Sequence, residues 1–437
     1  MKRKILSVLL CAAMVASMIV GCGSKEEAVV EEPAATEESA EAEVPEGGKL
    51  TLMLQADDDV RVSIMDDYIV PNFEEAFPGW ELEVITITGD DNGVAAMKTY
   101  NATGDLADVY WSNTRWCMPM ISSGNQMDLT EYITTDGFAD NYGGDISLMQ
   151  FNGAVYALQP GSDAQYFPAM YYNKEIFEAN GIEVPTTLDE LYAVCDKLLA
   201  AGITPIATDG TGWDLQCSFL NNFILAIDPS KVDALLNNEI DYSDEAVLEA
   251  FQIYETMMEK GYFGDRMATS AKQLNDAKEA FIAGEAAMRF DMYWNWSAFD
   301  NGTTDVFPFP TVDGVGQLWG NTTAGYAVYS KSENLEMAVK LAEYCCEQEA
   351  IYHNEHGTAT AFDTGIKVEA SSELQQKLND MCAAFPKRYA TIHTNSMDSA
   401  VAAEFKTLGA GFIAGQYDAE EFLKQFNEVY AENTFFE

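Results

Sequence analysis

The sequence is short of basic residues. Only 24 lysines and arginines stand against 71 aspartates and glutamates in 437 residues, a formal net charge of −47 at pH 7. Proteins bind nucleic acids chiefly through cations that neutralise phosphates, and polybasic segments hold proteins on anionic membrane surfaces. The composition therefore argues against both kinds of partner. An acidic surface of this kind keeps an exported protein soluble.

Sequence patterns of catalytic and metal sites are also missing. There is no GxSxG, Walker loop, GxGxxG or CxxC. His353 and His356 lie near Cys345 and Cys346, but this spacing does not match common zinc sites. The acidic run at residues 56–59 lacks the Gly and Glu of an EF-hand loop. We therefore expect no enzyme, no cofactor and no metal.

Only one long apolar run occurs, at residues 5–20, directly after three basic residues. It is shorter than the about 20 residues that cross a bilayer and has the pattern of an export signal. The run ends in "IVGC", which resembles the bacterial lipoprotein box, with Ile19 in place of the commoner leucine. The resemblance implies a signal peptide over residues 1–21 and a lipid, diacylglycerol and palmitate, on Cys22. A plain secreted protein with an incidental cysteine is the alternative.

The segment after Cys22 has no aromatic residue. Residues 23–48 contain nine glutamates, two prolines and one lysine, so they cannot bury enough apolar surface to offset the entropy of ordering. We expect residues 22–48 to be the lipidated cysteine and a disordered acidic tether. The remaining chain is long enough for two lobes.

Six of the eight cysteines remain after the signal peptide and Cys22 are set aside. Buried thiols and a disulfide both stay open for them, because connectivity cannot be read from a sequence. They are Cys117, Cys195, Cys217, Cys345, Cys346 and Cys382.

Strands and helices alternate along the rest of the chain. Residues 49–54, 80–87 and 107–111 read as strands, with a helix over residues 62–78, which is typical of a parallel sheet covered by helices. A second α/β series begins near residue 169. In it, Thr187 and Glu190 fit a capping box before a helix that Gly202 ends. A helix to Ala283, a stop at Gly284 and a strand over 286–290 follow, and residues 371–437 read as largely helical.

Four stretches carry a resemblance to a known family. "YALQPGSDAQYFPAMYYNKEIFEANGIEVPTTLDEL", "GDLADVYWSNTR", "AFIAGEAAMRFDMYWNW" and "GNTTAGYAVYSKSENLEMAVKLAEY" together resemble bacterial extracellular solute-binding proteins that serve carbohydrate ABC importers. The resemblance implies an α/β, two-lobed periplasmic-binding-protein (type II) fold, with a hinge between the lobes and the ligand in the cleft. The implied N-terminal lobe spans residues 49–160 plus about 320–362, and the C-terminal lobe spans 161–319 plus about 363–437.

Tryptophans give a separate indication of the ligand. Several follow strand ends, where ligands of open α/β sheets gather, and a sugar ring needs flat aromatic plates with polar groups around them. "WSNTRW" places Trp111, Asn113 and Arg115 together, and "DMYWNW" places Asp291 and Trp294 together.

Comparison with the maltose-binding member of the family adds residue roles. Trp111 and Arg115 match sugar-contacting positions, Trp294 matches a stacking tryptophan, and Thr114 replaces an aspartate. Ordinary packing, a solvated charge or a salt bridge between lobes is the alternative for these residues. The candidate ligand-binding set is Asp57, Asp58, Trp111, Asn113, Arg115, Asp163, Trp213, Asp291, Trp294 and Trp319.

The resemblance implies a monomeric receptor, lipid-anchored on the outer face of the cell membrane of a Gram-positive bacterium. It would capture a mono- or oligosaccharide, close by hinge motion and deliver the sugar to an ABC permease that works with a separate ATPase. The alternatives are the same fold with a peptide, polyamine or phosphorylated ligand, and a surface glycoside hydrolase with paired carboxylates.

Overall fold

The computed structural model divides the chain into residues 1–43 and a compact unit over residues 44–437. The predicted signal peptide, Cys22 and nearly all of the tether lie outside the residues that the structure describes. Those are residues 47–56, 59–89, 91–113, 116–151, 153–160, 167–212, 214–215, 219–236, 239–314, 318–320, 324–385, 388–390 and 399–431.

The first sheet has four strands in the order β11-β3-β1-β2. They are β1 (Gly48–Gln55), β2 (Trp80–Ile87), β3 (Val109–Ser112) and β11 (Gly325–Val328). The predicted parallel pairing is confirmed for β1 with β2 and with β3, whereas β11 comes from far along the chain and runs antiparallel to β3. Leu52, Met53, Val109 and Val328 are fully buried in the core around this sheet.

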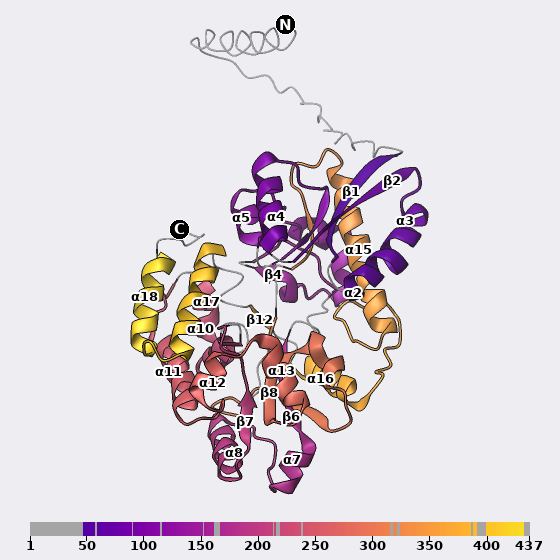
Figure 1. Cartoon of the computed structure of the whole chain (residues 1–437). Coiled ribbons are helices and arrows are strands. Elements are labelled where there is room, and N and C mark those ends of the chain that lie inside the picture. Colours follow the sequence, from indigo (N-terminus) through magenta and orange to yellow (C-terminus); the bar gives the residue numbers. More distant parts are fainter. Residues whose placement is uncertain are drawn as a thin grey trace, which may run out of the picture. The chain divides into compact units, whose positions relative to one another are not determined.

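Helices of the N-terminal part and one late helix cover the first sheet. Figure 1 shows α15 beside the early strands, and it packs on β3, β11 and η1. The helix predicted over residues 62–78 forms with a π turn, in which the Val70 N–H bonds to the Met65 carbonyl just before Pro71, which has no N–H to give. The helical elements are α2 (Asp59–Ser63), η1 (Ile64–Ile69), α3 (Val70–Ala76), α4 (Asp91–Thr103), α5 (Cys117–Ser122), α6 (Thr130–Thr135), η2 (Phe138–Tyr142), η3 (Ser147–Met149) and α15 (Leu335–Glu355).

The second sheet has the order β7-β8-β6-β9. Its strands are β6 (Pro168–Asn173), β7 (Thr204–Ala207), β8 (Ala286–Met292) and β9 (Thr304–Phe307). β7 and β8 are parallel, and β6 runs antiparallel to both β8 and β9. All seven residues of β8 are buried, and α13 packs on this strand.

The capping box predicted for the second series is confirmed. The Thr187 side chain accepts from the Glu190 N–H, and the Glu190 carboxylate accepts from the Thr187 N–H at 3.2 Å. Leu188, Leu191 and Leu198 of the helix α8 are buried, as their helical spacing predicted. Gly202 follows with φ +75°, which ends the helix in a conformation that favours glycine.

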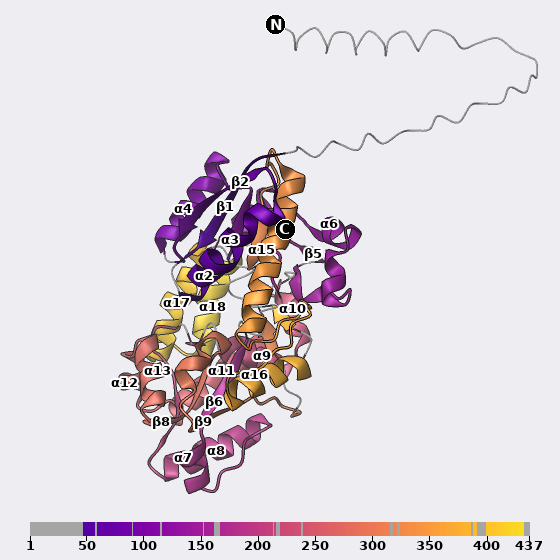
Figure 2. The ribbon, with the colours of Figure 1, turned by 90° about the vertical axis from the view of Figure 1, so that its right-hand side faces the viewer.

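The C-terminal helices complete the second core. The Phe251 ring of α11 lies within 4.5 to 6.2 Å of the rings of Phe405, Phe412 and Phe422 on α17 and α18, and α16 packs on β9 (Figure 2). The helical prediction for residues 371–437 is confirmed over the described part. The helices of this region are α7 (Lys174–Ala179), α8 (Leu188–Ala200), α9 (Leu220–Ile227), α10 (Ser230–Leu236), α11 (Glu245–Glu259), α12 (Arg266–Ser270), α13 (Leu274–Ile282), η6 (Tyr293–Asn295), α14 (Trp296–Phe299), α16 (Glu373–Ala384), α17 (Ser399–Ile413) and α18 (Ala419–Ala431).

Two short sheets lie outside the two larger ones. β4 (Gln150–Phe151) pairs with β5 (Ala154–Val155), and β10 (Leu318–Gly320) pairs with β12 (Arg388–Ala390). Each large sheet thus has its own buried core, and both sheets contain parallel strands whose carboxyl ends meet at one edge.

Candidate functional site

The carboxyl edge of the first sheet collects residues from three strands. β1 ends at Gln55 and its parallel neighbour β3 ends at Ser112, while the antiparallel β11 starts at Gly325 opposite Ser112. The Asn113 side-chain amide donates to Gln55 Oε1 at 3.2 Å, which joins the ends of β1 and β3. This is the place in an open sheet where ligands bind. The predicted Asp57, Asp58 and Arg115 follow these ends in the sequence but lie outside the described residues.

Trp111 is buried at this edge. It is 3% exposed, the Arg61 guanidinium lies 4.2 Å from its ring centroid, and the Tyr326 ring meets it edge-on at 5.2 Å. In this structure its ring therefore has no open face on which a sugar could stack, although the sequence predicted such a face. Its Nε1 is buried and has no hydrogen-bond partner among the described residues. What Trp111 offers at this edge is an unpaired N–H donor, with Arg61 over its ring.

Sequence reasoning missed Arg61 and Gln55. Both stand close to the end of β1 and beside the predicted Asp57 and Asp58, so their position after a strand was the available signal. Trp116, the second tryptophan of "WSNTRW", is 1% exposed. Its Nε1 donates to the Trp111 carbonyl at 3.2 Å, so it is a packing residue that supports Trp111.

The carboxyl edge of the second sheet holds a buried charged network. Arg289 on β8 lies beside Ala207, at the end of β7, and is 1% exposed. Its guanidinium bonds to Asp291 Oδ2 at 2.6 Å and to both oxygens of Asp214 at 3.0 and 3.3 Å. Asp209, also buried, accepts from the Asp214 N–H at 3.3 Å. Burial and the charge of Asp214 raise the pKa of Asp209 to about 7. Burial also raises the pKa of Asp214, an effect that Arg289 opposes.

Asp291 therefore contacts protein groups with both oxygens. Oδ2 pairs with Arg289, and Oδ1 accepts from the Met292 N–H and the Asn295 amide, each at 2.8 Å. The structure thus places this predicted ligand residue in an internal network. The other members, Asp209, Asp214 and Arg289, were not predicted, although "TDGTGWD" right after a strand was a visible signal.

Trp294 stands on the short η6 turn between Asp291 and Asn295. It is 42% exposed, while Trp80, Trp111 and Trp116 are each buried. Trp296, two residues on, packs against the core around Phe299. Among the tryptophans whose side chains are described, Trp294 is therefore the exposed one, and it follows the carboxyl end of β8.

The side chains of three further predicted residues are not described. Asp163 and Trp213 lie outside the described residues, although Asp214 follows Trp213 directly. Trp319 belongs to β10, where its backbone pairs with Tyr389, and its side chain is not described.

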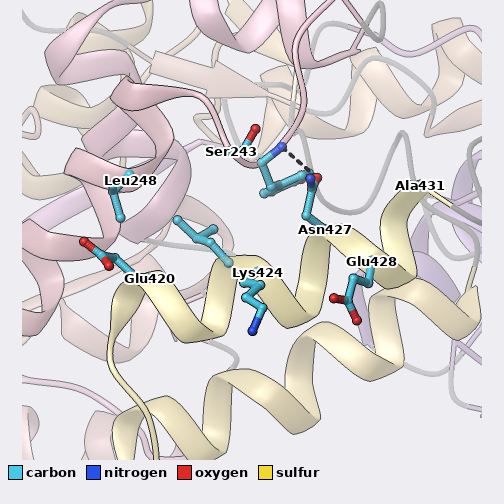
Figure 3. Close-up of a pocket in the computed structure, with 9 residues that line it drawn as sticks. Ser243, Leu248, Glu420, Lys424, Asn427, Glu428 and Ala431 are labelled. Atoms are coloured by element: carbon cyan, nitrogen blue, oxygen red, sulfur yellow. Dashed lines mark hydrogen bonds between the residues drawn. The ribbon is translucent and has the colours of Figure 1, made fainter.

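Two cavities lie away from both edges. One of about 490 Å³ lies between α11 and α18 and includes Leu248, Lys424 and Asn427, whose Oδ1 accepts from the Tyr242 N–H at 3.1 Å (Figure 3). The other, of about 470 Å³, includes Phe77, Glu343 and Phe362. Neither contains a residue of the predicted set.

The described residues contain no group of three His, Cys, Asp or Glu side chains that could hold a metal ion. Five of the six cysteines after the tether form no disulfide, namely Cys117, Cys195, Cys345, Cys346 and Cys382. Cys217 lies outside the described part of the chain.

The family comparison agrees with this architecture. Residues 58–350 match the model of the bacterial extracellular solute-binding protein family, and this chain belongs to that family. Two solved structures share the fold: a chitin oligosaccharide binding protein (TM-score 0.69, 20% identity, 88% of this chain and 98% of that one) and the sugar-binding protein MalE of Xanthomonas citri (0.66, 16%, 88% and 96%). The fold is thus the two-lobed α/β fold of solute-binding proteins, as predicted.

Curated relatives match this chain over part of its length. The multiple sugar-binding protein of Streptococcus mutans is 25% identical over 326 residues, 70% of this chain and 74% of the relative. An ABC transporter extracellular-binding protein of Pyrococcus horikoshii is 25% identical over 306 residues, 67% of this chain and 65% of the relative. The osmoprotective compounds-binding protein GgtB of Synechocystis is 23% identical over 205 residues, 44% of this chain and 48% of the relative. The chain thus spans about half to two thirds of the length of these last two relatives.

None of the described helices is both long and apolar enough to cross a bilayer.

Proposed function

We propose that this chain is a lipid-anchored extracellular receptor that binds a mono- or oligosaccharide and delivers it to the permease of an ABC importer. The observation that carries the proposal is Trp294, an indole 42% exposed at the carboxyl edge of the second sheet. The C–H face of a sugar ring stacks on such a plate, while its hydroxyls need polar groups at the rim. Gln55 and Asn113 place side-chain amides at the edge of the first sheet.

The charge of the second edge favours a neutral ligand. Arg289 is paired with both Asp214 and Asp291, so its charge is already balanced inside the protein. Asp209 adds a further carboxyl group beside Asp214. An anionic ligand such as a phosphorylated sugar would meet net negative charge here. This supports a carbohydrate over the phosphorylated alternative.

The same network supports binding over hydrolysis. A glycoside hydrolase needs two carboxyl groups facing the substrate about 5 to 9.5 Å apart. Asp209, Asp214 and Asp291 are buried, and all three bond to backbone or side-chain groups of the protein. The relatives are also named as binding proteins. The name of the GgtB relative makes an osmoprotective compound the non-sugar solute to include in the test.

Intrinsic fluorescence of residues 44–437 tests the proposal, because this part forms its own compact unit. A panel of mono- and oligosaccharides, an osmoprotectant and a phosphorylated sugar is titrated in turn. We expect one carbohydrate to give a saturable change that Trp294→Ala removes. The control is Trp296→Phe, which alters a core tryptophan two residues away.

A saturable response to the charged solute or the osmoprotectant alone would overturn the carbohydrate assignment. Cleavage of a labelled oligosaccharide during the same incubation would overturn the receptor assignment.

A further inference from the structure

We propose that Arg289 is a positioning residue of the binding site, which ties the loop after β7 to the turn after β8 and so fixes the orientation of Trp294. The role of Trp294 as a ligand plate rests on the proposed function. The connection from Arg289 to the turn rests on the geometry of the described residues alone.

The guanidinium of Arg289 donates hydrogen bonds to three residues. It donates to Asp291 Oδ2, to both Asp214 oxygens and, from Nη1 at 3.3 Å, to the Ala207 carbonyl. Arginine has five N–H donors in one fixed plane, so it can hold two carboxylates in a set mutual geometry. One side chain on β8 therefore joins Asp214, in the loop after β7, to Asp291, near the end of β8.

The path from Arg289 to Trp294 passes through Asp291. While Oδ2 of Asp291 pairs with Arg289, its Oδ1 accepts from the Met292 N–H and from the Asn295 amide. These two donors flank the turn on which Trp294 stands. Tyr293 adds a second anchor, because its side chain is fully buried and its N–H donates to the Phe167 carbonyl at 2.9 Å. The chain before Trp294 is thus held through the backbone N–H groups of Met292 and Tyr293, and the residue after it through the Asn295 side chain.

The other branch holds the loop after β7. Asp214 Oδ2 accepts from the Thr208 hydroxyl at 3.1 Å and from the Asp209 N–H at 3.0 Å, in addition to Arg289. Asp209 in turn accepts from the Asp214 N–H and from Thr211. Each end of this loop bonds to the other, and Arg289 connects the closed loop to β8.

A buried ion pair of this kind is a weak source of stability. The cost of removing the charges from water often cancels their attraction, and well-packed apolar side chains serve a core as well or better. What an apolar residue at position 289 cannot supply is a hydrogen-bonded link between the loop after β7 and the end of β8. The place of the network, at the carboxyl edge of the sheet and next to an exposed tryptophan, gives that link its use.

Arg289→Met in residues 44–437 is the first test, with Arg266→Met as matched control. Arg266 is a partly buried arginine of the same lobe, and its guanidinium bonds to the Ile413 and Phe412 carbonyls of α17 at 2.9 and 2.7 Å. We expect Arg289→Met to speed amide hydrogen exchange in residues 208–214 and 293–296. It should also lower the affinity for the carbohydrate identified in the titration by about tenfold. An effect of this size is seen when residues that orient metal ligands are lost. Arg266→Met should leave both readouts unchanged.

Two further variants keep the test decisive. Arg289→Lys should fail to restore binding, because one ammonium cannot reproduce the planar fork. If Arg289→Met does not fold, Asp291→Asn removes the charge and keeps the shape, and it should change exchange in residues 293–296 in the same direction. Unchanged amide hydrogen exchange and unchanged carbohydrate affinity in a folded Arg289 or Asp291 variant would refute the inference. If no carbohydrate binds the parent chain, the proposed function fails, while the exchange data still decide the role of Arg289.

Discussion

Asp209 makes the stability of this protein depend on pH in a way that one substitution should remove. The residue is fully buried. Burial and the charge of Asp214 raise its pKa from 3.8 to about 7. The charged and titratable groups nearby are Asp214, the Arg289 guanidinium that Asp214 binds, Tyr254 on α11 and Arg266 on α12. We predict that Asp209→Asn stabilises the protein at pH 8 and not at pH 4.

The sign follows from the two pKa values. In the unfolded chain Asp209 loses its proton near pH 3.8, whereas the folded protein keeps it until about pH 7. Between these values the folded state binds the extra proton, so stability falls as pH rises and then levels off. The difference corresponds to about 4 kcal/mol, at about 1.4 kcal/mol for each pKa unit. Asparagine cannot ionise. Its NH₂ group stands in place of a carboxyl oxygen that accepts from the Asp214 N–H, and the loss of that hydrogen bond lowers the free energy of unfolding by about 1 kcal/mol.

We therefore expect Asp209→Asn to raise the free energy of unfolding by up to about 3 kcal/mol at pH 8 and to lower it by about 1 kcal/mol at pH 4. Urea unfolding of residues 44–437 followed by intrinsic fluorescence measures both values. Asp228→Asn is the control, because hydrogen bonds from Ser230 lower the pKa of Asp228. Its stability change should be the same at pH 5 and pH 8. An equal effect of Asp209→Asn at both ends of the range would refute the reasoning.

Two other predictions concern the anchor and the first core. Cys22→Ser should move the protein from the membrane fraction to the medium, because the predicted lipid is then absent; retention in the membrane would contradict the lipoprotein assignment. Glu343 has its pKa raised to about 8 by burial and by a hydrogen bond and charge from Asp136, so its folded form keeps a proton that the unfolded chain loses near pH 4.5. Glu343→Gln should therefore raise the melting temperature more at pH 9 than at pH 5. A uniform shift would count against a protonated Glu343.

Trp111 shows where residue type alone misleads. Its place after a strand and beside Arg115 predicted an open stacking plate. In the structure the Arg61 guanidinium and the Tyr326 edge lie against its ring, and 3% of the residue is exposed. Arg61 comes from a helix that follows another strand, so no local pattern could reveal this contact. Trp294 has the same kind of sequence neighbourhood and is exposed.

Local signals were enough for much of the secondary structure. The capping box of Thr187 and Glu190, the stops at Gly202 and Gly284 and the strands β1, β2 and β8 all rest on neighbours within a few residues. Alternating strands and helices also predicted parallel pairing, and the family motifs predicted two lobes. These features depend on backbone geometry and on short-range periodicity, which a sequence carries directly.

The sequence by itself determined the acidic charge, the two α/β series and the family, and it predicted strand ends as the place of a ligand site. Only the tertiary structure decided which side chains at those ends are exposed and which are held inside. Arg289 lies 75 residues from Asp214 along the chain and 2 residues from Asp291. Asp214 reaches Arg289 because β7 and β8 pair in parallel, which brings the loop after β7 beside the end of β8. Burial and long-range pairing are properties of the packed chain, so Asp209 has a pKa near 7 and Trp294 stays exposed for reasons that no local pattern contains.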